Sequence, residues 1–481
     1  MTSKIKNVFL GLLTLVLINS CNLINSSNSS SSSVVSNGSS ISISSNNILT
    51  ANLLSINDTH GRLLSTGGEI GMDKVSGNIK KMEANKGEYI KIANGDIFQG
   101  TYESNVLYGR PMIDCLNEMN FDCLVIGNHE FDWGIDKIAA YKDGNLENGE
   151  ANFDFLTCNI VYKESNMPLT WAEPYIIKES EGGAKVGIIG AIGEYLTSSI
   201  SGSRIKDYDF LDPVPLIETY AKELRDEEKC DIVVVAIHEY ERSTCERIAS
   251  LTNSSRIDGI FTAHTHSKVN ETAGSKKIPV LQGACNNEYL AIMNFEVENG
   301  VVRTNKVLLS NSSASSDSKI NTIVNSYVNG ELKTKGEEVI GYNSSYKSAA
   351  YMAQVFVNAM HEIYGGDVAI SNKAREPLDQ GNITIKEMYQ VFPFDNMIIK
   401  AKISGEKLIG FYNYAYSIYY SEGFNINDIK ANETYEIVII DYVYDNERNT
   451  NYFSQDPSIR VEQNQYMRDF MIDYIKEKEN I

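Results

Sequence analysis

Short apolar runs that alternate with longer amphipathic stretches set the strongest limit on the fold of this chain. Several of the runs are rich in Val and Ile and are bounded by Gly, Asn or Asp, as buried strands are. The stretches between them, such as 106–120 and 215–229, repeat their apolar residues at helical spacing. The runs occupy residues 49–56, 89–93, 123–126, 155–158, 186–191, 231–237, 259–263 and 278–282. This alternation predicts a layered α/β fold.

The length of the chain, 481 residues, favours two domains with short appendages over a single domain. We expect the first domain at 48–310, ending in two strands around a turn at 298–300. A Ser/Asn-rich break and a polar helix over 319–335 form the expected linker at 311–344. The second domain is expected at 345–481, with helices near 349–364 and 405–420 and strands near 368–370, 397–403 and 435–441.

The N-terminal segment has the features of an export signal followed by a flexible tether. A basic start precedes the apolar run 8–18, which is too short to span a bilayer as a mature helix. A small residue and Cys21 follow, as in a bacterial lipoprotein cleavage site. Residues 1–20 are therefore the expected signal peptide, Cys21 the lipidated residue and the Ser/Asn-rich segment 21–47 the tether. We expect an exported chain in the cell envelope, lipid-anchored to a membrane. The alternative is an ordinary signal peptide that happens to contain a Cys.

The acidic balance of the chain limits its partners. The formal net charge is −20 and the pI is near 4.8, and such a surface repels polyanions, so nucleic acid is not an expected partner. A small anionic substrate still binds where a local positive centre, such as bound metal ions, overcomes the field. No obligate protein partner is inferred. The cysteines after Cys21 include no C-x-x-C pair, so a cysteine zinc site is not expected.

Residues of the metal-ligand type follow five of the predicted strands. These segments are Asn-Asp-Thr-His at 57–60, Asn-Gly-Asp at 94–96, Gly-Asn-His-Glu-Phe-Asp at 127–132, His at 238 and His-Thr-His at 264–266. Five of the six histidines fall in them, and only His361 lies elsewhere. The carboxyl ends of strands are where α/β sheets gather their ligands. Because Asp oxygens and His nitrogens suit borderline divalent metals such as Zn, Mn or Fe, the pattern predicts a metal centre.

These strings resemble, in order, the motifs of the calcineurin-like metallophosphoesterases. More closely, the chain from about residue 48 to about residue 453 is similar to the bacterial periplasmic 5′-nucleotidase and UDP-sugar hydrolase family, most strongly in its first domain. The resemblance implies a four-layer α/β/β/α metallophosphoesterase domain followed by a smaller α/β C-terminal substrate domain. It also implies two divalent metal ions, Zn, Mn or similar, and hydrolysis of nucleotide phosphate monoesters.

The resemblance also implies two ligand sets that share one carboxylate, Asp96. The first metal would be held by Asp58, His60, Asp96 and His266, and the second by Asp96, Asn128, His238 and His264. A carboxylate is a natural bridge between two cations, and two such ions clamp both ends of an in-line displacement.

His129 and Asp132 match the family's catalytic dyad. The carboxylate, one turn onward, would orient the imidazole and stabilise its charged form, and the ring would donate to a phosphoryl or leaving-group oxygen. The alternative for His129 is a supporting role behind the metal ligands. Glu130 is expected to position the loop rather than to bind metal.

The second domain resembles the family's nucleoside-binding domain only in part. Asn372 and Arg375 stand where the family carries an Asn and a phosphate-binding Arg, although the glycines between them are absent. The alternative for Arg375 is an ordinary surface arginine. The family holds the base between two aromatic rings, and here Phe424 is expected to supply one and Tyr452 or Phe453 the other. The turn at 393–396 matches the family's Pro-Phe-Gly-Asn turn and is expected to be structural, with Asn396 facing the ligand.

These departures in the second domain leave two alternatives open. One is an enzyme with the same centre that acts on UDP-sugars, 2′,3′-cyclic nucleotides or thiosulfate esters. The other is a surface binding lipoprotein that keeps the fold without catalysis.

Overall fold

The structure of the chain is a computed structural model that describes residues 48–454 and 456–481. The expected signal peptide, the lipidated Cys21 and the tether lie outside the described residues. Asn46–Ile481 forms one compact unit, which contains both expected domains. Among the helices of the described ranges, none combines the length and the apolar character needed to cross a bilayer.

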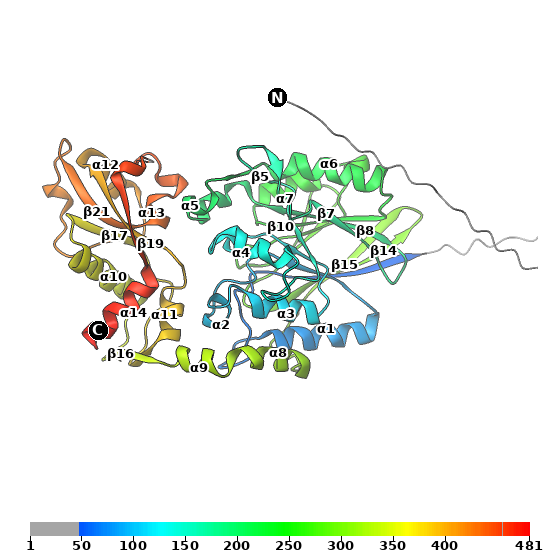
Figure 1. The fold of residues 1–481 in the computed structure, drawn as a ribbon. Coiled ribbons are helices and arrows are strands. Elements are labelled where there is room, and N and C mark those ends of the chain that lie inside the picture. Colours follow the sequence, from blue (N-terminus) through cyan, green and yellow to red (C-terminus); the bar gives the residue numbers. More distant parts are fainter. Residues whose placement is uncertain (1–47, 455) are drawn as a thin grey trace, which may run out of the picture. The chain divides into compact units, whose positions relative to one another are not determined.

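Two six-stranded sheets form the centre of the first domain (Figure 1). In the first sheet the order is β15 (Val301–Ser310), β14 (Tyr289–Glu298), β1 (Leu49–Ile56), β2 (Ile90–Asn94), β3 (Cys123–Val125) and β4 (Asp154–Leu156). In the second it is β12 (Lys268–Ala273), β13 (Ile278–Gly283), β11 (Gly259–Phe261), β10 (Ile232–His238), β8 (Lys185–Ile192) and β7 (Tyr175–Glu179). Strands β1 to β4 run parallel, as do β8, β10, β11 and β13. Their carboxyl ends therefore gather on common edges.

Apolar side chains from both sheets meet in one buried layer between them. Leu53 and Ile92 from the first sheet and Val186 and Val234 from the second belong to this cluster, and all four are fully buried. Strands covered on both faces read as continuous apolar runs, which is the pattern by which the sequence predicted them.

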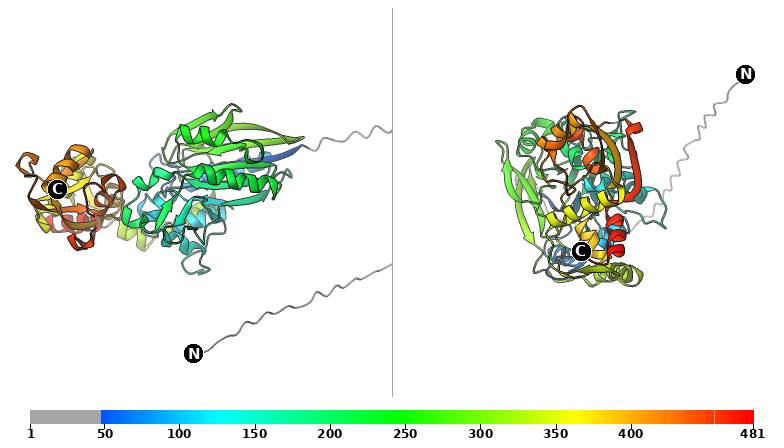
Figure 2. Two further views of the ribbon diagram at one scale, coloured as in Figure 1. Left: turned by 90° about the horizontal axis from the view of Figure 1, so that it is seen from above. Right: turned by 90° about the vertical axis from the view of Figure 1, so that its left-hand side faces the viewer.

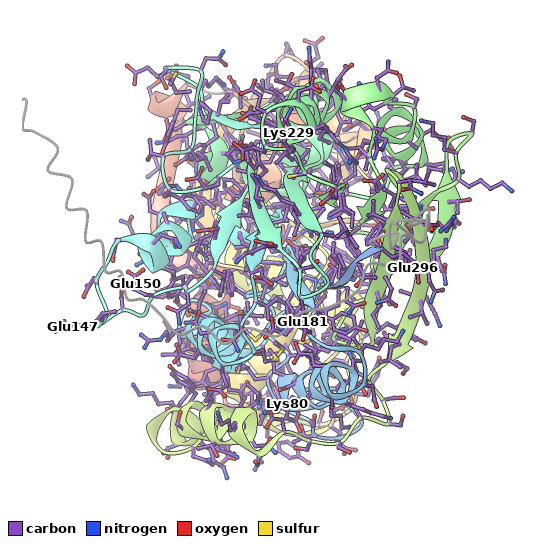
Figure 3. All side chains as sticks on the ribbon, turned by 90° about the vertical axis from the view of Figure 1, so that its right-hand side faces the viewer. Lys80, Glu147, Glu150, Glu181, Lys229 and Glu296 are labelled. Atoms are coloured by element: carbon purple, nitrogen blue, oxygen red, sulfur yellow. The ribbon has the colours of Figure 1, made fainter. Side chains whose placement is uncertain are left out.

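Helices cover the outer face of each sheet, so the first domain has four layers (Figures 1 and 2). α1 (Met72–Lys86), α3 (Arg110–Glu118) and α8 (Ser318–Val328) share an apolar cluster with the first sheet, and α6 (Pro213–Asp226) and α7 (Arg242–Ala249) share another with the second. Lys80 of α1 and Lys229, which follows α6, are exposed on these two helical layers (Figure 3). The expected α/β/β/α order is confirmed.

The helix expected over 106–120 begins later than predicted, because a glycine separates two helices here: α3 starts at Arg110. α2 (Tyr102–Asn105) ends before Gly109, which adopts a left-handed conformation with φ 86°, and Pro111 stands in the first turn of α3. Glycine tolerates positive φ and proline suits the first helical turn, so both residues favour a break here.

The connection between the domains is more closely attached to the first domain than a linker would be. Ile320 and Val324 of α8 are buried in the core of the first domain. Ile340 on β16 (Val339–Asn343) belongs to the core of the second domain, so that core begins before residue 345. Between them lies the short helix α9 (Glu331–Gly336).

The second domain is built on a mixed five-stranded sheet. Its order is β20 (Ile418–Tyr420), β17 (Val368–Asn372), β21 (Thr434–Ile440), β19 (Met397–Ser404) and β22 (Arg460–Tyr466), and β16 pairs separately with β18 (Gly381–Thr384). The helices of this domain are α10 (Ala349–Tyr364), α11 (Ile385–Val391), α12 (Gly405–Tyr414), α13 (Asp441–Tyr444) and α14 (Met467–Lys478).

One helix of the second domain ends earlier than the sequence predicted. α12 ends at Tyr414 rather than continuing to residue 420, and Ser417 has φ 57°. The next three residues form β20, which pairs antiparallel with β17. Ile and Tyr at 418–420 favour a strand once the sheet edge of β17 is available, and this tertiary contact overrides the helical spacing.

Short elements complete the first domain. A three-stranded sheet has the order β6 (Met167–Pro168), β5 (Ile160–Tyr162) and β9 (Tyr208–Phe210), and the helices α4 (Ile135–Ala139) and α5 (Gly202–Ile205) lie in the connections.

Candidate metal centre and active site

The loops that leave β1, β2, β3, β10 and β11 bring the predicted ligands together at the carboxyl ends of the strands. Several of these residues adopt left-handed backbone conformations, with φ between 48° and 72°; they are Asp58, His60, Asp96, His264 and His266. Such conformations are uncommon for residues other than glycine and cluster at functional sites, where the surrounding structure holds them. The backbone of these loops is thus held in an unfavourable conformation that aims the side chains at common points.

A first cluster of donors contains Asp58, His60 and His266, whose ligand atoms all lie within 4.8 Å of one another. The Nε2 atoms of His60 and His266 are 2.9 Å apart, and Nε2 of His266 lies 3.5 Å from Oδ1 of Asp58. Two ring nitrogens that face each other so closely, beside a carboxylate, form a donor set that a cation between them would satisfy.

A second cluster contains Asp96, His238 and His264, again within 4.8 Å of one another. Nε2 of His238 lies 3.1 Å from Oδ2 of Asp96. Oδ1 of Asn128 lies 3.2 Å from Nε2 of His238 and 2.9 Å from Nδ1 of His264. The amide oxygen therefore adds a neutral donor to this cluster.

Backbone carbonyls fix the orientation of two of the histidine rings. Nδ1 of His60 donates to the carbonyl of Gln99 at 3.0 Å, and Nδ1 of His238 donates to that of Asn94 at 2.9 Å. Each contact leaves Nε2 of the same ring facing the carboxylates. Metal-binding histidines commonly use their second nitrogen in this way.

The protonation states of the clusters also suit cations. Burial lowers the pKa of His60 to about 3 and that of His264 to about 4, so both rings are neutral and offer lone pairs. Burial raises the pKa of Asp58 to about 7. Burial works against a charge on His238, but the Asp96 carboxylate outweighs it and raises the pKa of His238 to about 10. A bound cation would take the place of the shared proton between these two residues.

The residues present therefore fit two borderline divalent ions, one at each cluster. All seven predicted ligands lie in or against the two clusters. Asp96 groups with the second cluster, and its expected bridging to the first stays a prediction.

The predicted dyad lies next to the second cluster. His129 begins a short 3-10 helix, His129–Phe131, and its Nδ1 lies 2.9 Å from Oδ2 of Asp132 one turn onward. The backbone N–H of His129 donates to Oδ1 of Asp96 at 2.9 Å, which ties the dyad to the metal ligands. Burial opposes a charge on the ring, but Asp132 outweighs it and raises the pKa of His129 to about 9. The ring thus holds a proton that it can donate at neutral pH.

Glu130 joins the loops that carry the ligands. Its side chain is fully buried and accepts the backbone N–H groups of Asp96 and Ile97 at 2.9 Å and of Gly127 at 2.8 Å. These contacts link the loop after β2 to the loop after β3. Glu130 therefore positions the loops, as the sequence suggested.

Replacing Glu130 with Ala is expected to destabilise the protein. Three buried N–H groups would lose their acceptor, and each such group costs about 1–3 kcal/mol, so the free energy of unfolding should fall by about 3 kcal/mol or more. Urea denaturation of the metal-free protein measures this loss. Glu147→Ala is the matched control, because Glu147 is exposed (Figure 3). Equal stability of the two variants would contradict the positioning role.

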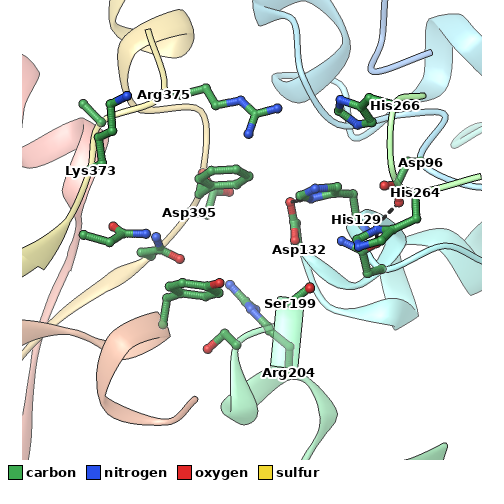
Figure 4. Close-up of a pocket in the computed structure, with 17 residues that line it drawn as sticks. Asp96, His129, Asp132, Ser199, Arg204, His264, His266, Lys373, Arg375 and Asp395 are labelled. Carbon is green, nitrogen blue, oxygen red and sulfur yellow. Dashed lines mark hydrogen bonds and ion pairs between the residues drawn. The ribbon is translucent and has the colours of Figure 1, made fainter. Parts of the chain in front are cut away.

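A cavity of about 440 Å³ opens in front of the dyad (Figure 4). Residues of the first domain line one side, among them His129, Asp132 and His264, and residues of the second domain line the other, among them Asn372 and Arg375. Burial, with a smaller contribution from the Arg375 guanidinium, lowers the pKa of His266. The structure thus brings both predicted polar substrate residues to the cavity.

The turn 393–396 reaches the metal-binding loops directly. The carbonyl of Pro393 accepts from Nδ2 of Asn105 at 3.2 Å and from Nε2 of Gln99 at 3.3 Å. This places the Phe394 ring parallel to that of His129, with centroids 5.7 Å apart and an angle of 11°. Asn396 lines the same cavity.

The three aromatic residues expected to hold a base do not line this cavity. Phe424 stacks on Tyr420, with centroids 5.1 Å apart. Tyr452 packs edge-on against Phe411. Phe453 is only 2% exposed and sits between Phe411 and Tyr444, so it is a core residue of the second domain and its faces are covered. The assignment of Phe453 to a base clamp is therefore corrected: its side chain completes the core.

The cavity is also lined by residues that the sequence analysis did not identify as site residues. Phe394 and Tyr442 supply rings, and Ser199, Ser201 and Arg204 supply polar groups from the loop that contains α5. Phe394 lies in the turn that matches the family's motif, so comparison with that motif could have predicted its place in the site. Arg204 and Tyr442 belong to no motif, and only the folded chain brings them here.

The fold and the two donor clusters are similar to those of the calcineurin-like phosphoesterases, a class of metal-dependent phosphoester hydrolases. Residues 51–268 match the family model described as calcineurin-like phosphoesterase. Residues 328–411 match the model described as the 5′-nucleotidase C-terminal domain. The chain thus matches the two domain models of the 5′-nucleotidases, in this order.

Curated relatives match most of the chain, and a solved structure shares its fold. Endonuclease YhcR of Bacillus subtilis is 26% identical over 398 residues, which are 74% of this chain and 32% of that protein. A 5′-nucleotidase of Vibrio cholerae is 22% identical over 75% of this chain and 74% of its own length. The crystal structure of a 5′-nucleotidase precursor from Thermus thermophilus superposes with a TM-score of 0.72 at 17% identity, over 90% of this chain and 97% of that one. The match covers only 32% of the length of Endonuclease YhcR and 27% of that of another relative, the cell wall protein Lmo0130 of Listeria monocytogenes. The chain therefore spans about a third or less of these two proteins.

Proposed function

We propose that this chain hydrolyses the phosphate monoesters of nucleotides at a dinuclear divalent-metal centre. The observation that carries the proposal is the convergence of two donor clusters and the His129–Asp132 pair on one cavity. Arg375 and Asn372 of the second domain line the opposite side of that cavity. Zn or Mn is the expected ion, because the donors are imidazoles, carboxylates and an amide oxygen.

The residues of the chain divide the chemistry between them. When bound, two divalent ions neutralise the charge that develops on the phosphoryl oxygens and activate the attacking water. His129 holds a proton for the leaving-group oxygen, and Asp132 fixes the ring through its 2.9 Å contact with Nδ1. The Arg375 guanidinium is suited to bind phosphate oxygens in a bidentate manner from the side of the second domain.

A second candidate is an enzyme with the same centre that acts on UDP-sugars or 2′,3′-cyclic nucleotides. It stays open because Phe424, Tyr452 and Phe453, the rings expected to hold the base of a nucleoside monophosphate, do not line the cavity. The metal ligands and the dyad would serve either class of substrate, so the second domain decides between the two. A surface binding lipoprotein is disfavoured, since binding alone would not require the ligands and the dyad to be kept together.

A substrate panel distinguishes these candidates. Protein comprising residues 48 onward would receive Mn, Zn or Co and then AMP, UDP-glucose, a 2′,3′-cyclic nucleotide or p-nitrophenyl phosphate. We expect hydrolysis of AMP and of p-nitrophenyl phosphate that depends on added metal. Turnover of UDP-glucose or the cyclic nucleotide with AMP untouched would favour the second candidate, and no hydrolysis of any substrate would refute both.

We also propose that the chain acts in the cell envelope as a lipid-anchored protein. The support is the apolar run 8–18 followed by Cys21 and the Ser/Asn-rich segment. In cells that express the whole chain, the protein is expected in the membrane fraction, and Cys21→Ala is expected to release it. A variant that stays in the membrane fraction as fully as the parent would argue against lipidation.

A further inference from the structure

The ring of His129 is held from two sides. Asp132 contacts its Nδ1 at 2.9 Å, which fixes one atom of the ring, and the Phe394 ring lies parallel to it, with centroids 5.7 Å apart and an angle of 11°. Offset parallel rings attract each other, so the stack restrains the plane of the imidazole, which a single hydrogen bond leaves free to tilt. Because Phe394 belongs to the second domain, the orientation of the dyad ring depends on how the turn 393–396 is held.

Arg468 holds this turn on both sides of Phe394. It lies at the start of α14, where its Nη1 donates to the carbonyl of Pro393 at 3.1 Å and its Nη2 donates to the carboxylate of Asp395. A planar guanidinium presents these donors in a fixed fork. One side chain therefore sets the positions of the residues before and after Phe394.

The same contacts join the turn to the first domain. The carbonyl of Pro393 also accepts from Gln99, which lies in the loop after β2. The Arg468 guanidinium stacks on Tyr389, with its carbon 3.8 Å from the ring centroid, and Tyr389 meets Tyr102 of α2 edge-on at 5.0 Å. Arg468 thus lies within a set of contacts that fixes the turn relative to the loops that carry the metal ligands.

Arg468 is buried away from the cavity in front of the dyad. It is not among the residues that line this cavity, and its side chain is only 6% exposed. A buried cation costs several kcal/mol unless its partners offset this cost, and an apolar residue in its place is often as stable or more so. The Nε of Arg468 finds no hydrogen-bond acceptor in the described part of the chain. Stability alone therefore does not account for an arginine here, whereas its two contacts with the turn do.

We propose that Arg468 is a positioning residue for the general acid His129. By fixing Pro393 and Asp395, it holds Phe394 against the imidazole. The stack in turn aims the proton on Nε2 of His129 at the leaving-group oxygen. This rests on the proposed function, in which His129 protonates the leaving group. A misplacement of about 1 Å caused by a change far from the reacting atoms can lower a rate by about 10²-fold, so a contact that sets the ring plane bears directly on turnover.

Steady-state kinetics with two leaving groups test this role. In Arg468→Gln, kcat should fall by about 10- to 100-fold for AMP, whose leaving group needs a proton, and by less than about twofold for p-nitrophenyl phosphate, whose leaving group does not. Arg468→Lys, which keeps the charge but loses the planar fork, should recover part of the AMP rate. An unchanged AMP rate in Arg468→Gln, or an equal loss on both substrates, would overturn the proposal.

Arg225→Gln is the matched control for the loss of a buried arginine. Arg225 lies on α6 of the first domain, pairs with Asp258, is 7% exposed and likewise has no acceptor for its Nε among the described residues. This variant should lose stability in a similar way and keep the ratio of the two rates. All rates are measured at a temperature at which circular dichroism shows each variant folded. A change of this ratio as large as that in Arg468→Gln would mean that destabilisation, and not positioning, causes the effect.

NMR spectra of the histidine rings separate failure of this role from failure of the proposed function. The chain has six histidines, so the ring signals of His129 can be assigned by their loss in His129→Ala. In protein supplied with Zn, a diamagnetic ion, the ring current of Phe394 shifts these signals, and Phe394→Leu gives their positions without the stack.

Arg468→Gln should move the His129 signals toward the positions seen in Phe394→Leu, and Arg225→Gln should not. This result would support the positioning role even if the protein hydrolysed none of the substrates. Identical His129 signals in the parent and in Arg468→Gln would reject the role even if AMP were hydrolysed well.

Discussion

Replacing Asp96 with Asn is expected to lower metal-dependent hydrolysis by at least about a thousandfold. The loss follows from the several kcal/mol of charge stabilisation that a metal centre supplies, at about 1.36 kcal/mol for each factor of ten. The Asp96 side chain is 1% exposed, lies 3.1 Å from Nε2 of His238 and accepts the backbone N–H of His129 at 2.9 Å. One carboxylate therefore serves both the donor cluster and the dyad, and an amide in its place weakens both.

Metal analysis distinguishes this cause from a general loss of structure. Asp96→Asn should bind fewer than two ions per chain while keeping its secondary structure by circular dichroism. Asp136→Asn is the matched control, because Asp136 is exposed on α4. Full metal content together with full activity in Asp96→Asn would show that Asp96 is not a ligand.

Replacing His129 with Ala is expected to lower turnover of AMP by about 10²–10⁴-fold, the range that general acid catalysis contributes. The metal content should stay close to that of the parent, because His129 belongs to neither donor cluster. The loss should be smaller for p-nitrophenyl phosphate, whose leaving group departs without a proton. Initial rates on both substrates, with metal content measured on the same samples, test these points.

The sixth histidine supplies the control for this variant. His361 lies on α10, where its Nε2 contacts the carbonyl of Gly366, and His361→Ala should leave hydrolysis unchanged. If His129→Ala lost metal as well as activity, His129 would be a support of the ligand loops. An equal loss on both substrates would mean that the ring does not protonate the leaving group.

The metal side of the site could be predicted from the sequence because each ligand lies at the end of a buried strand or shortly after it. Asp58 follows β1 and Asp96 follows β2 in the first sheet, and His264 follows β11 in the second, and the parallel strands of each sheet place such residues at its carboxyl edge. The short distances within each cluster also need the left-handed backbone of these loops. That conformation could not be read from the residues, since only a minority of Asp and His residues adopt it.

The substrate side could be predicted only where the chain kept a motif. Arg375 and Asn372 reach the cavity, whereas Phe453 completes a core. Aromatic residues are abundant in this chain, with 28 Tyr and 16 Phe. An aromatic residue in a given segment of the sequence therefore does not show whether it packs in a core or lines a binding site. Arg204 was missed because its place depends on contacts between its loop and the second domain, more than two hundred positions away, such as Asn446 to Ser198.

Titration of the metal-free protein with Mn or Zn tests the dinuclear centre most directly. Bound metal and hydrolysis of p-nitrophenyl phosphate would be measured on the same samples as ions are added. We predict no hydrolysis without metal and a rise that ends when two ions are bound per chain. Hydrolysis that persists after complete metal removal, or that reaches its maximum with one ion bound, would contradict a dinuclear centre.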